Sequence, residues 1–200
     1  MDYREINSSE YDLYASQVAD IHLEAYSLKH MTAHFSKKKI EEYYRCLTEN
    51  CELFIIASET REETVSGQVV GFIVAGPNIS KGVDLFLKDN RYYVLWLMLR
   101  NPSFLLQKTI TIVRSKILKS KPSIANFRLL SIAVRDRDQS HGVGKGMLQF
   151  FEKILKGKGV SLYGLSVRNQ NHRAVSFYKR NGFLMEKEVS RTRYYIRKVN

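Results

Sequence analysis

Cysteine is scarce in this chain of 200 residues, and it has no long apolar runs. The two cysteines, Cys46 and Cys51, match no metal-ligand spacing and have no Cys or His pair nearby, which indicates reduced thiols and no metal site. No apolar run approaches the roughly 18 residues that a membrane helix needs. The charged start, Met1 to Ile6, lacks the apolar core of a signal peptide. We therefore expect a cytoplasmic globular protein.

Acidic side chains are also few. The chain has 32 Lys and Arg against 20 Asp and Glu, which gives a net charge of +12. Such a balance favours an anionic partner, and nucleic acid, an acidic lipid or a phosphorylated cofactor would each fit. The length suits one domain, or one domain with an insertion.

The most informative segment runs from Arg135 to Lys145. It follows an apolar, strand-like run, Leu129–Val134, and opens a helical pattern that extends to about Lys156. Glycines at such a junction let backbone N–H groups approach a ligand, and the helix N-terminus adds partial positive charge. The segment is typical of a phosphate-binding loop, although a plain tight turn uses the same residues.

Two common phosphate-binding patterns do not fit this segment. A dinucleotide fingerprint requires a third glycine where Met147 stands, and a P-loop requires Ser or Thr where Gly146 stands. The pattern that remains is Gln139-x-x-Gly142-x-Gly144.

A second informative segment follows the apolar run 160–167. A helix is predicted from Asn171, which is suited to be its N-cap, to about Asn181. Residues three and four apart share a helix face, so Asn171 and Tyr178 are expected to point the same way.

The two segments together resemble the GNAT superfamily of acyl-CoA-dependent N-acetyltransferases. The matching residues are Leu129–Val134, the glycine pattern and Asn171-x-x-Ala174-x-x-Phe177-Tyr178-x-x-x-Gly182-Phe183. The resemblance is close from about residue 127 to 183, and upstream it rests on the order of the elements. It implies an α+β fold of three layers, with a mixed, largely antiparallel central sheet and flanking helices, in a single domain spanning residues 1–200.

The N-terminal half is predicted to hold a short strand, two helices and an antiparallel hairpin with a long loop. The expected ranges are 2–6, 12–26, 37–50 with Ser36 as N-cap, 53–57 and 69–75. A last strand, 189–199, is expected to pair with 182–187.

The segment 84–122 departs from the family pattern and is predicted to be a helical insertion. Two helices broken at Asn101-Pro102 are expected, and the segment has eight basic and two acidic residues, a net charge of +6. Three roles stay open: a lid over the acceptor site, a homodimer contact, or a peripheral contact with an acidic membrane.

The resemblance also implies the site residues. The backbone of Ile132, Ala133 and Val134 would bind the pantetheine arm and the thioester oxygen. The pyrophosphate would lie on Gln139, Ser140, His141, Gly142, Val143, Gly144 and Lys145, mainly on backbone N–H groups. Asn171 would contact the coenzyme besides capping its helix, and Tyr178 would be the general acid unless it is simply a core residue. Acetyl-CoA is the co-substrate expected, with no metal.

The general base is left open by the sequence. Many relatives carry Glu where Arg128 stands, and a guanidinium cannot serve as a base. The candidate bases are His30, His34, Glu24 and His172. Arg128 would instead suit an anionic acceptor, such as a nucleotide-linked sugar.

The implied function is transfer of an acetyl group from acetyl-CoA to a primary amine, with a small molecule such as an amino sugar as acceptor. A protein or peptide amine is the alternative acceptor. A second class of function is a non-catalytic module that binds acyl-CoA, nucleic acid or acidic lipid. The phosphates of the coenzyme already account for basic residues near the loop, so no nucleic-acid partner is expected.

Overall fold

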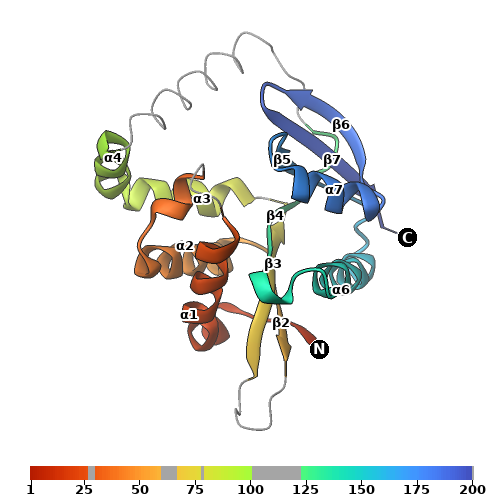
Figure 1. The fold of residues 1–200 in the computed structure, drawn as a ribbon, viewed down its shortest axis with the longest axis horizontal. Coiled ribbons are helices and arrows are strands. Elements are labelled where there is room, and N and C mark those ends of the chain that lie inside the picture. Colours follow the sequence, from red (N-terminus) through yellow and green to blue (C-terminus); the bar gives the residue numbers. More distant parts are fainter. Residues whose placement is uncertain (27–29, 60–66, 78, 101–122, 200) are drawn as a thin grey trace.

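The computed structural model describes residues 1–26, 30–59, 67–77, 79–100 and 123–199 (Figure 1). Helices and strands are interspersed along the chain. Their bounds are β1 Asp2–Glu5, α1 Ser8–Ala25, η1 Met31–His34, α2 Lys37–Asn50, β2 Leu53–Glu59, β3 Gln68–Gly76, α3 Ile79–Asp89, α4 Arg91–Arg100, β4 Phe127–Val134, η2 Asp136–Asp138, α6 Val143–Gly157, β5 Leu162–Arg168, α7 His172–Arg180, β6 Leu184–Val189 and β7 Thr192–Lys198.

The strands form one seven-stranded sheet with the order β1-β2-β3-β4-β5-β7-β6. Neighbouring strands are antiparallel except β4 and β5, which run parallel. The sheet is therefore mixed and largely antiparallel, which confirms the predicted fold class.

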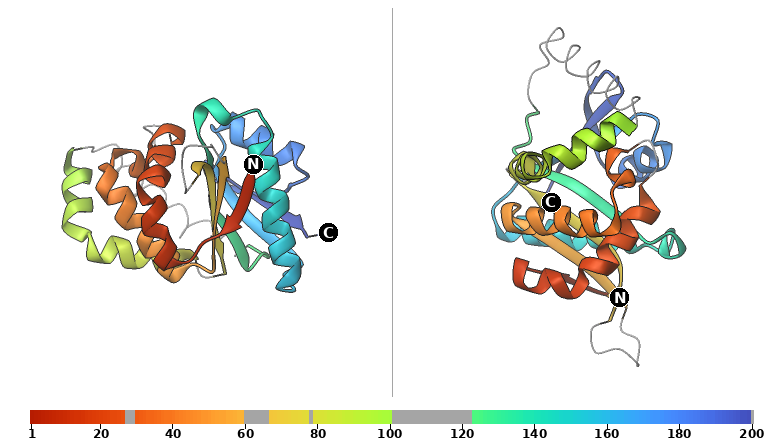
Figure 2. Two further views of the ribbon diagram at one scale, coloured as in Figure 1. Left: turned by 90° about the horizontal axis from the view of Figure 1, so that it is seen from below. Right: turned by 90° about the vertical axis from the view of Figure 1, so that its left-hand side faces the viewer.

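Helices cover both faces of the sheet. One apolar cluster joins α1 and α2 to β2 and β3, with Tyr44 and Phe72 among its buried members. A second cluster on the other face joins α6 and α7 to the sheet through Phe151 and Tyr163. Figure 2 shows the resulting three layers, with α1 and α2 on one side of the sheet and α6 on the other. Because both faces are covered, β3 is buried almost throughout, as its unbroken apolar run requires.

The first helix begins earlier than predicted. It was expected from residue 12, whereas α1 begins at Ser8. The Asn7 side chain accepts hydrogen bonds from the backbone of Ser9 and Glu10 at 2.9 and 3.1 Å, and the Glu10 carboxylate accepts from the Asn7 backbone at 3.0 Å. This reciprocal capping box fixes the helix start. The second helix begins after Ser36, as predicted, and the Ser36 hydroxyl accepts from the Lys39 backbone.

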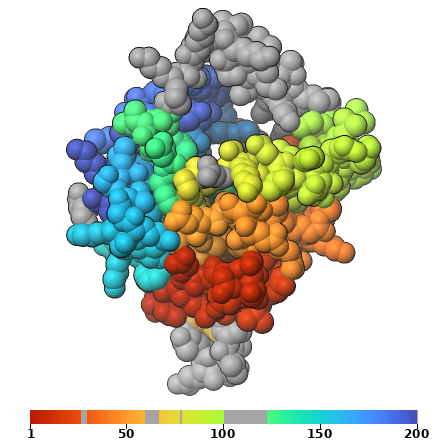
Figure 3. Space-filling model, turned by 180° about the vertical axis from the view of Figure 1, so that it is seen from behind, coloured from red at the N-terminus to blue at the C-terminus, as the bar shows by residue number. Residues whose placement is uncertain are grey.

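The described part of the insertion consists of α3 and α4. Helix α3 begins at Ile79, earlier than the predicted boundary, and the break between the two helices lies at Asn90. The predicted break at Asn101-Pro102 and the helix after it lie outside the described residues. Phe86 of α3 and Leu97 of α4 are buried in the cluster around α2. Figure 3 shows α1, α2, α3 and α4 following one another across this face.

The outer face of α4 is apolar and exposed. Its exposed large side chains are Tyr92, Leu95, Trp96 and Leu99. Among the described residues, no helix has both the length and the apolar character needed to cross a membrane. The lid, dimer and membrane roles of the insertion stay predictions.

Candidate active site

Strands β4 and β5 part after a single short contact. Their parallel pairing involves Phe127 with Tyr163 and Arg128 with Gly164. Beyond Arg128, β4 continues along β3 to Val134 while β5 continues along β7. The backbone of β4 that faces the gap is therefore open to hydrogen bonds from a ligand in extended conformation. The splay exposes the backbone of Ile132, Ala133 and Val134, which the resemblance assigns to the pantetheine arm.

A β-bulge changes which side chains of β4 face each layer. Ser131 pairs with Val74 and Leu129 pairs with Ala75, so one residue of β4, Leu130, has no partner of its own. After the bulge, Ser131 faces the α1 side, where it contacts the Tyr26 and Tyr44 hydroxyls. Ile132 on the next position packs with the cluster under α6.

The loop after β4 leads into an uncapped helix. Ser140 and Gly142 have φ of 70° and 83°, in the left-handed region. Gly142 is the N-cap of α6, and no side chain caps the helix there. The first N–H groups of such a helix have no partner within it and carry partial positive charge, so the turn at Val143, Gly144 and Lys145 is suited to bind a phosphate oxygen.

The side chain of Gln139 supports this loop from inside. Its amide nitrogen donates to the Val134 carbonyl at 2.8 Å and to the Asp136 carboxylate at 2.6 Å. These two hydrogen bonds hold the conformation of the chain between β4 and the loop. Because they occupy the Gln139 amide, the backbone N–H groups at the start of α6 are the groups available to a ligand.

Gly144 is needed for the close approach of α6 and α7. A Cβ atom at this position would lie 3.2 Å from two ring carbons of Phe177, tighter than ordinary van der Waals contact. A side chain there would push α7 away from the N-terminus of α6.

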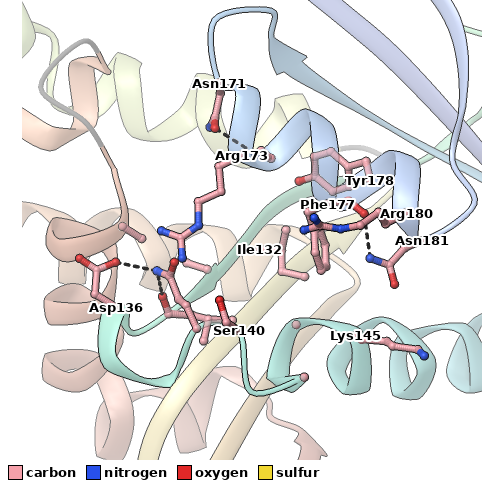
Figure 4. A pocket seen from close by; sticks show the side chains of 17 residues that line it. Ile132, Asp136, Ser140, Lys145, Asn171, Arg173, Phe177, Tyr178, Arg180 and Asn181 are labelled. Atoms are coloured by element: carbon pink, nitrogen blue, oxygen red, sulfur yellow. Dashed lines mark hydrogen bonds between the residues drawn. The ribbon is translucent and has the colours of Figure 1, made fainter.

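A pocket of about 510 Å³ lies between β4, this loop and α7 (Figure 4). It is lined by ten of the predicted residues: Ile132, Ala133, Val134, Gln139, Ser140, Gly142, Gly144, Lys145, Asn171 and Tyr178. The two other predicted residues, His141 and Val143, do not line it, and the Val143 side chain is buried in the core. The structure thus brings together most of the predicted set.

Seven more residues line the pocket, and none of them was among the predicted site residues. They are Ala25, Asp136, Arg173, Ala174, Phe177, Arg180 and Asn181. Arg173 extends from α7 across the pocket toward the loop that carries Asp136 and Ser140 (Figure 4). Together with Lys145 and Arg180 it makes the rim cationic, which favours a ligand with phosphates.

Helix α7 carries Asn171 and Tyr178 to the same pocket, as their spacing predicted. The Asn171 side chain accepts from the Ala174 backbone at 3.1 Å, so it is an N-cap as well as a lining residue. The Tyr178 side chain is 7% exposed. Burial raises the pKa of the Tyr178 phenol well above its ordinary value, and the nearby Tyr26 adds to the rise. The phenol is therefore protonated at neutral pH and able to donate a proton.

On the α1 side of β4 lies a hydrogen-bonded array that the sequence did not predict. The Tyr26 hydroxyl bonds Ser131 Oγ at 2.6 Å, and Ser131 Oγ lies 3.3 Å from the Tyr44 hydroxyl. The array continues from the Tyr44 hydroxyl to His22 Nδ1 at 2.8 Å, and from His22 Nε2 to Thr32 Oγ1 at 3.0 Å.

His30 ends the array. Its Nδ1 lies 3.1 Å from Thr32 Oγ1, and its ring packs edge-on against Tyr26 with centroids 5.2 Å apart. The His22 ring stacks on the Tyr26 ring, with the two ring centroids 4.1 Å apart. Burial lowers the pKa of His22 to about 3, with a smaller contribution from His30, so the central imidazole is neutral.

The part of the chain that the structure describes contains no set of metal ligands. No group of three or more His, Cys, Asp or Glu side chains there could hold a metal ion. Cys46 and Cys51 are both free thiols.

An open strand edge beside an uncapped helix N-terminus with a cationic rim is suited to an extended ligand that carries phosphates. A sequence model described as the acetyltransferase (GNAT) family matches residues 15–183. Because the match covers most of the chain, the chain belongs to the GNAT acetyltransferase family. It is an acetyl-CoA-dependent N-acetyltransferase.

Solved structures agree on the fold at low sequence identity. The chain is similar to a PaiA N-acetyltransferase from Thermoplasma acidophilum in complex with coenzyme A (19% identity, 98% of each chain covered, TM-score 0.55). It is similar to the ribosomal-protein-S18-alanine N-acetyltransferase from Escherichia coli (13%, 100% of this chain and 94% of that chain, 0.55). An aminoglycoside 6'-acetyltransferase type Ii is a further similar structure (12%, 100% and 98%, 0.59). No curated protein matches the chain.

Proposed function

We propose that this enzyme transfers the acetyl group of acetyl-CoA to a primary amine of a small molecule, with an amino sugar as the leading candidate. The observation that carries the proposal is the pocket between β4 and α7, where open strand backbone, the uncapped start of α6 and the Tyr178 phenol meet. In the proposal the coenzyme lies in this pocket, with its pyrophosphate on the N–H groups at the start of α6.

The donor side of the reaction follows from these positions. The thioester carbonyl lies against the backbone of Ile132–Val134, whose N–H groups stabilise the negative charge that forms on its oxygen. The amine nitrogen bonds to the carbonyl carbon, and the carbon–sulfur bond then breaks. The departing thiolate takes its proton from Tyr178, which burial keeps protonated.

The acceptor amine must lose a proton, because an alkylamine has a pKa near 10 and only its neutral form attacks. We assign this proton to His30. Of the candidate bases named from the sequence, His30 is the one that Thr32 joins to the array ending at Ser131 of β4. The other candidates are Glu24 on α1, His34 at the end of η1, and His172 on the donor side beside Asn171.

The acceptor class rests on the polar character of the α1 side of β4. Tyr26, His30 and Ser131 offer hydroxyl and imidazole groups at close quarters, which suits a compact polyhydroxylated amine. A protein or peptide amine is the second candidate. The protein and antibiotic acetyltransferases among the similar structures match the fold equally well, so their likeness does not separate the two. The cytoplasmic location expected from the sequence stays a prediction.

The experiment is an assay of thiol release from acetyl-CoA with matched acceptors. Amino sugars and peptides with a free N-terminus or lysine are compared at equal amine concentration. Faster turnover of amino sugars supports the proposal, and turnover confined to peptides replaces it with the second candidate. If coenzyme binding measured by calorimetry persists without turnover of any amine, the chain is instead a non-catalytic acyl-CoA-binding module.

A further inference from the structure

Arg128 stands at the point where β4 and β5 part. It is the last residue of β4 that pairs with β5, opposite Gly164. Its neighbours Phe127 and Leu129 belong to the cluster under α6, so Arg128 faces the other side of the sheet, the side of α1. Its position is therefore on the acceptor side of the splay, one short stretch of strand before Ser131.

The guanidinium lies in a built recess. Its carbon is 5.6 Å from the centre of the Tyr194 ring, whose sequence neighbour Tyr195 faces the opposite layer. The absence of a side chain at Gly164 makes room for it, because a Cβ there would lie 3.3 Å from Arg128 Nη1. Lys187 Nζ lies 5.0 Å from the same ring, so a second cation stands close by.

The charge of Arg128 is not neutralised locally. Among the described residues it forms no ion pair, and Nη1 is buried without a hydrogen-bond partner. The carboxylate of Glu186, whose charge acts on the guanidinium, accepts from Ser123 Oγ at 2.7 Å and from the Ile124 backbone at 2.8 Å. Partial burial lowers the pKa of the guanidinium. The charges of Tyr194 and Glu186 act in the opposite direction, but their effect is smaller.

A buried guanidinium nitrogen without a hydrogen-bond partner is unfavourable, and an anionic ligand that accepted from it would remove this cost. A buried donor of a charged group without a partner costs more free energy than a surface one, and a planar guanidinium is matched in shape to a carboxylate or a phosphate. We propose that Arg128 binds an anionic group of the amine acceptor, so that the enzyme acetylates amino sugars that carry a phosphate or a carboxylate. This inference rests on the proposed function and names the substrate class of the same site.

The position of Arg128 also limits the geometry of the acceptor. Arg128 precedes Ser131 by three residues, and because the bulge at Leu130 takes up one of them, the separation along the strand is about 7 Å. With the amine at the thioester beside Ile132, the anion must stand several bonds away from the amine.

The test compares acceptors that differ in one group. Glucosamine, glucosamine 6-phosphate and the corresponding amino uronic acid are assayed with the wild-type enzyme and with Arg128→Gln, by thiol release. The ratio of kcat/KM for an anionic acceptor over glucosamine is expected to fall about 10- to 100-fold in Arg128→Gln, the range of a charged hydrogen bond. The two anionic acceptors distinguish phosphate from carboxylate as the recognised group.

Two further variants keep the result interpretable. Arg191→Gln removes an exposed cation from the turn between β6 and β7. It is expected to leave the ratio unchanged, because the preference for an anionic acceptor comes from Arg128 and not from the net charge of the protein. Arg128→Lys keeps the charge without the planar fork and is expected to give an intermediate ratio. Melting temperatures of all variants establish that each is folded.

A ratio that is equal in wild type and Arg128→Gln would overturn the inference, as would a wild-type enzyme that prefers glucosamine. Binding separates this failure from failure of the proposed function. If no amine is acetylated, calorimetry of glucosamine 6-phosphate with the coenzyme A complex still decides the point. Wild-type binding that is lost in Arg128→Gln supports the anion site, and equal or absent binding in both refutes it.

Discussion

The buried imidazole of His22 predicts how stability depends on pH. His22 is 1% exposed, and its pKa is lowered by burial to about 3, against 6.5 for an ordinary histidine. As pH falls below 6.5, the unfolded chain takes up a proton at this residue while the folded chain does not. The free energy of unfolding therefore falls with pH across the window from 6.5 down to about 3.

The size of the effect follows from the two pKa values. Each unit of pH in this window is worth about 1.4 kcal/mol, so the loss at pH 4.5 is roughly 2 to 3 kcal/mol relative to pH 7.5. For a chain of this length, that is a shift of the melting temperature by roughly 5 to 10 °C. Other groups titrate in the same range, so the contribution of His22 must be isolated by difference.

The assay is urea unfolding followed by circular dichroism, at pH 7.5 and 4.5, for wild type and His22→Gln. Glutamine differs in shape from the buried imidazole, so the variant is expected to be less stable at pH 7.5. Because glutamine does not titrate, the free energy of unfolding of the variant should fall by roughly 2 to 3 kcal/mol less on acidification. His172→Gln is the matched control, since His172 is exposed at the start of α7. Its pH dependence should follow that of the wild type. Parallel losses in wild type and His22→Gln would refute the assignment of a neutral buried imidazole.

Three further substitutions probe the donor side. Tyr178→Phe should lower kcat about 100-fold or more while calorimetry shows retained acetyl-CoA binding, and unchanged turnover would remove Tyr178 from its role as acid. Gly142→Ala should lower the free energy of unfolding in urea by about 1 kcal/mol, because φ is 83° at this position and alanine is strained there. Gly157→Ala, in the last turn of the same helix with open space around it, is the control and should be neutral or stabilising. Equal effects of the two substitutions would contradict the assignment of the loss to backbone strain. Asn171→Ala should cost about 1 kcal/mol in thermal unfolding through the lost cap, and a stability equal to that of the wild type would show that the cap is dispensable.

The elements that the sequence predicted are those whose signals are local. The hairpin of β2 and β3 follows from two apolar runs, and α7 follows from an N-cap at Asn171 and helical spacing up to Tyr178. The missed start of α1 also had a local signal, since Asn7 and Glu10 have the spacing of a capping box. The start of α1 at Ser8 is therefore encoded in the sequence by these two residues.

The lining residues on the exposed turns of α7 were harder to predict. Arg173 and Arg180 look like ordinary solvated charges, and the sequence does not say which face of a short helix borders a pocket. Their spacing of seven residues places them on one face, which is a signal that helical geometry offers once the pocket side is known. The structure supplies that side by placing Asn171 and Tyr178 at the same opening.

The acceptor side could not be predicted because it is assembled from distant segments. Tyr26 and Ser131 are 105 residues apart, Tyr44 and Ser131 are 87 apart, and both contacts depend on the bulge at Leu130 that turns Ser131 toward α1. Simple alternation along β4 would have placed Ser131 in the opposite layer. Neither the bulge nor the partner helices leave a pattern in the sequence around Ser131.

This contrast has a physical cause that bears on specificity. The coenzyme is recognised by backbone geometry at one strand-to-helix junction, and backbone geometry is encoded by glycines and caps within about a dozen residues. In the proposal, the acceptor is recognised by side chains that distant segments bring together on the other side of β4, among them Tyr26, Arg128 and Ser131. In the proposal Arg128 illustrates this separation, because it does not line the donor pocket and its guanidinium would select an anionic acceptor on the other side of β4.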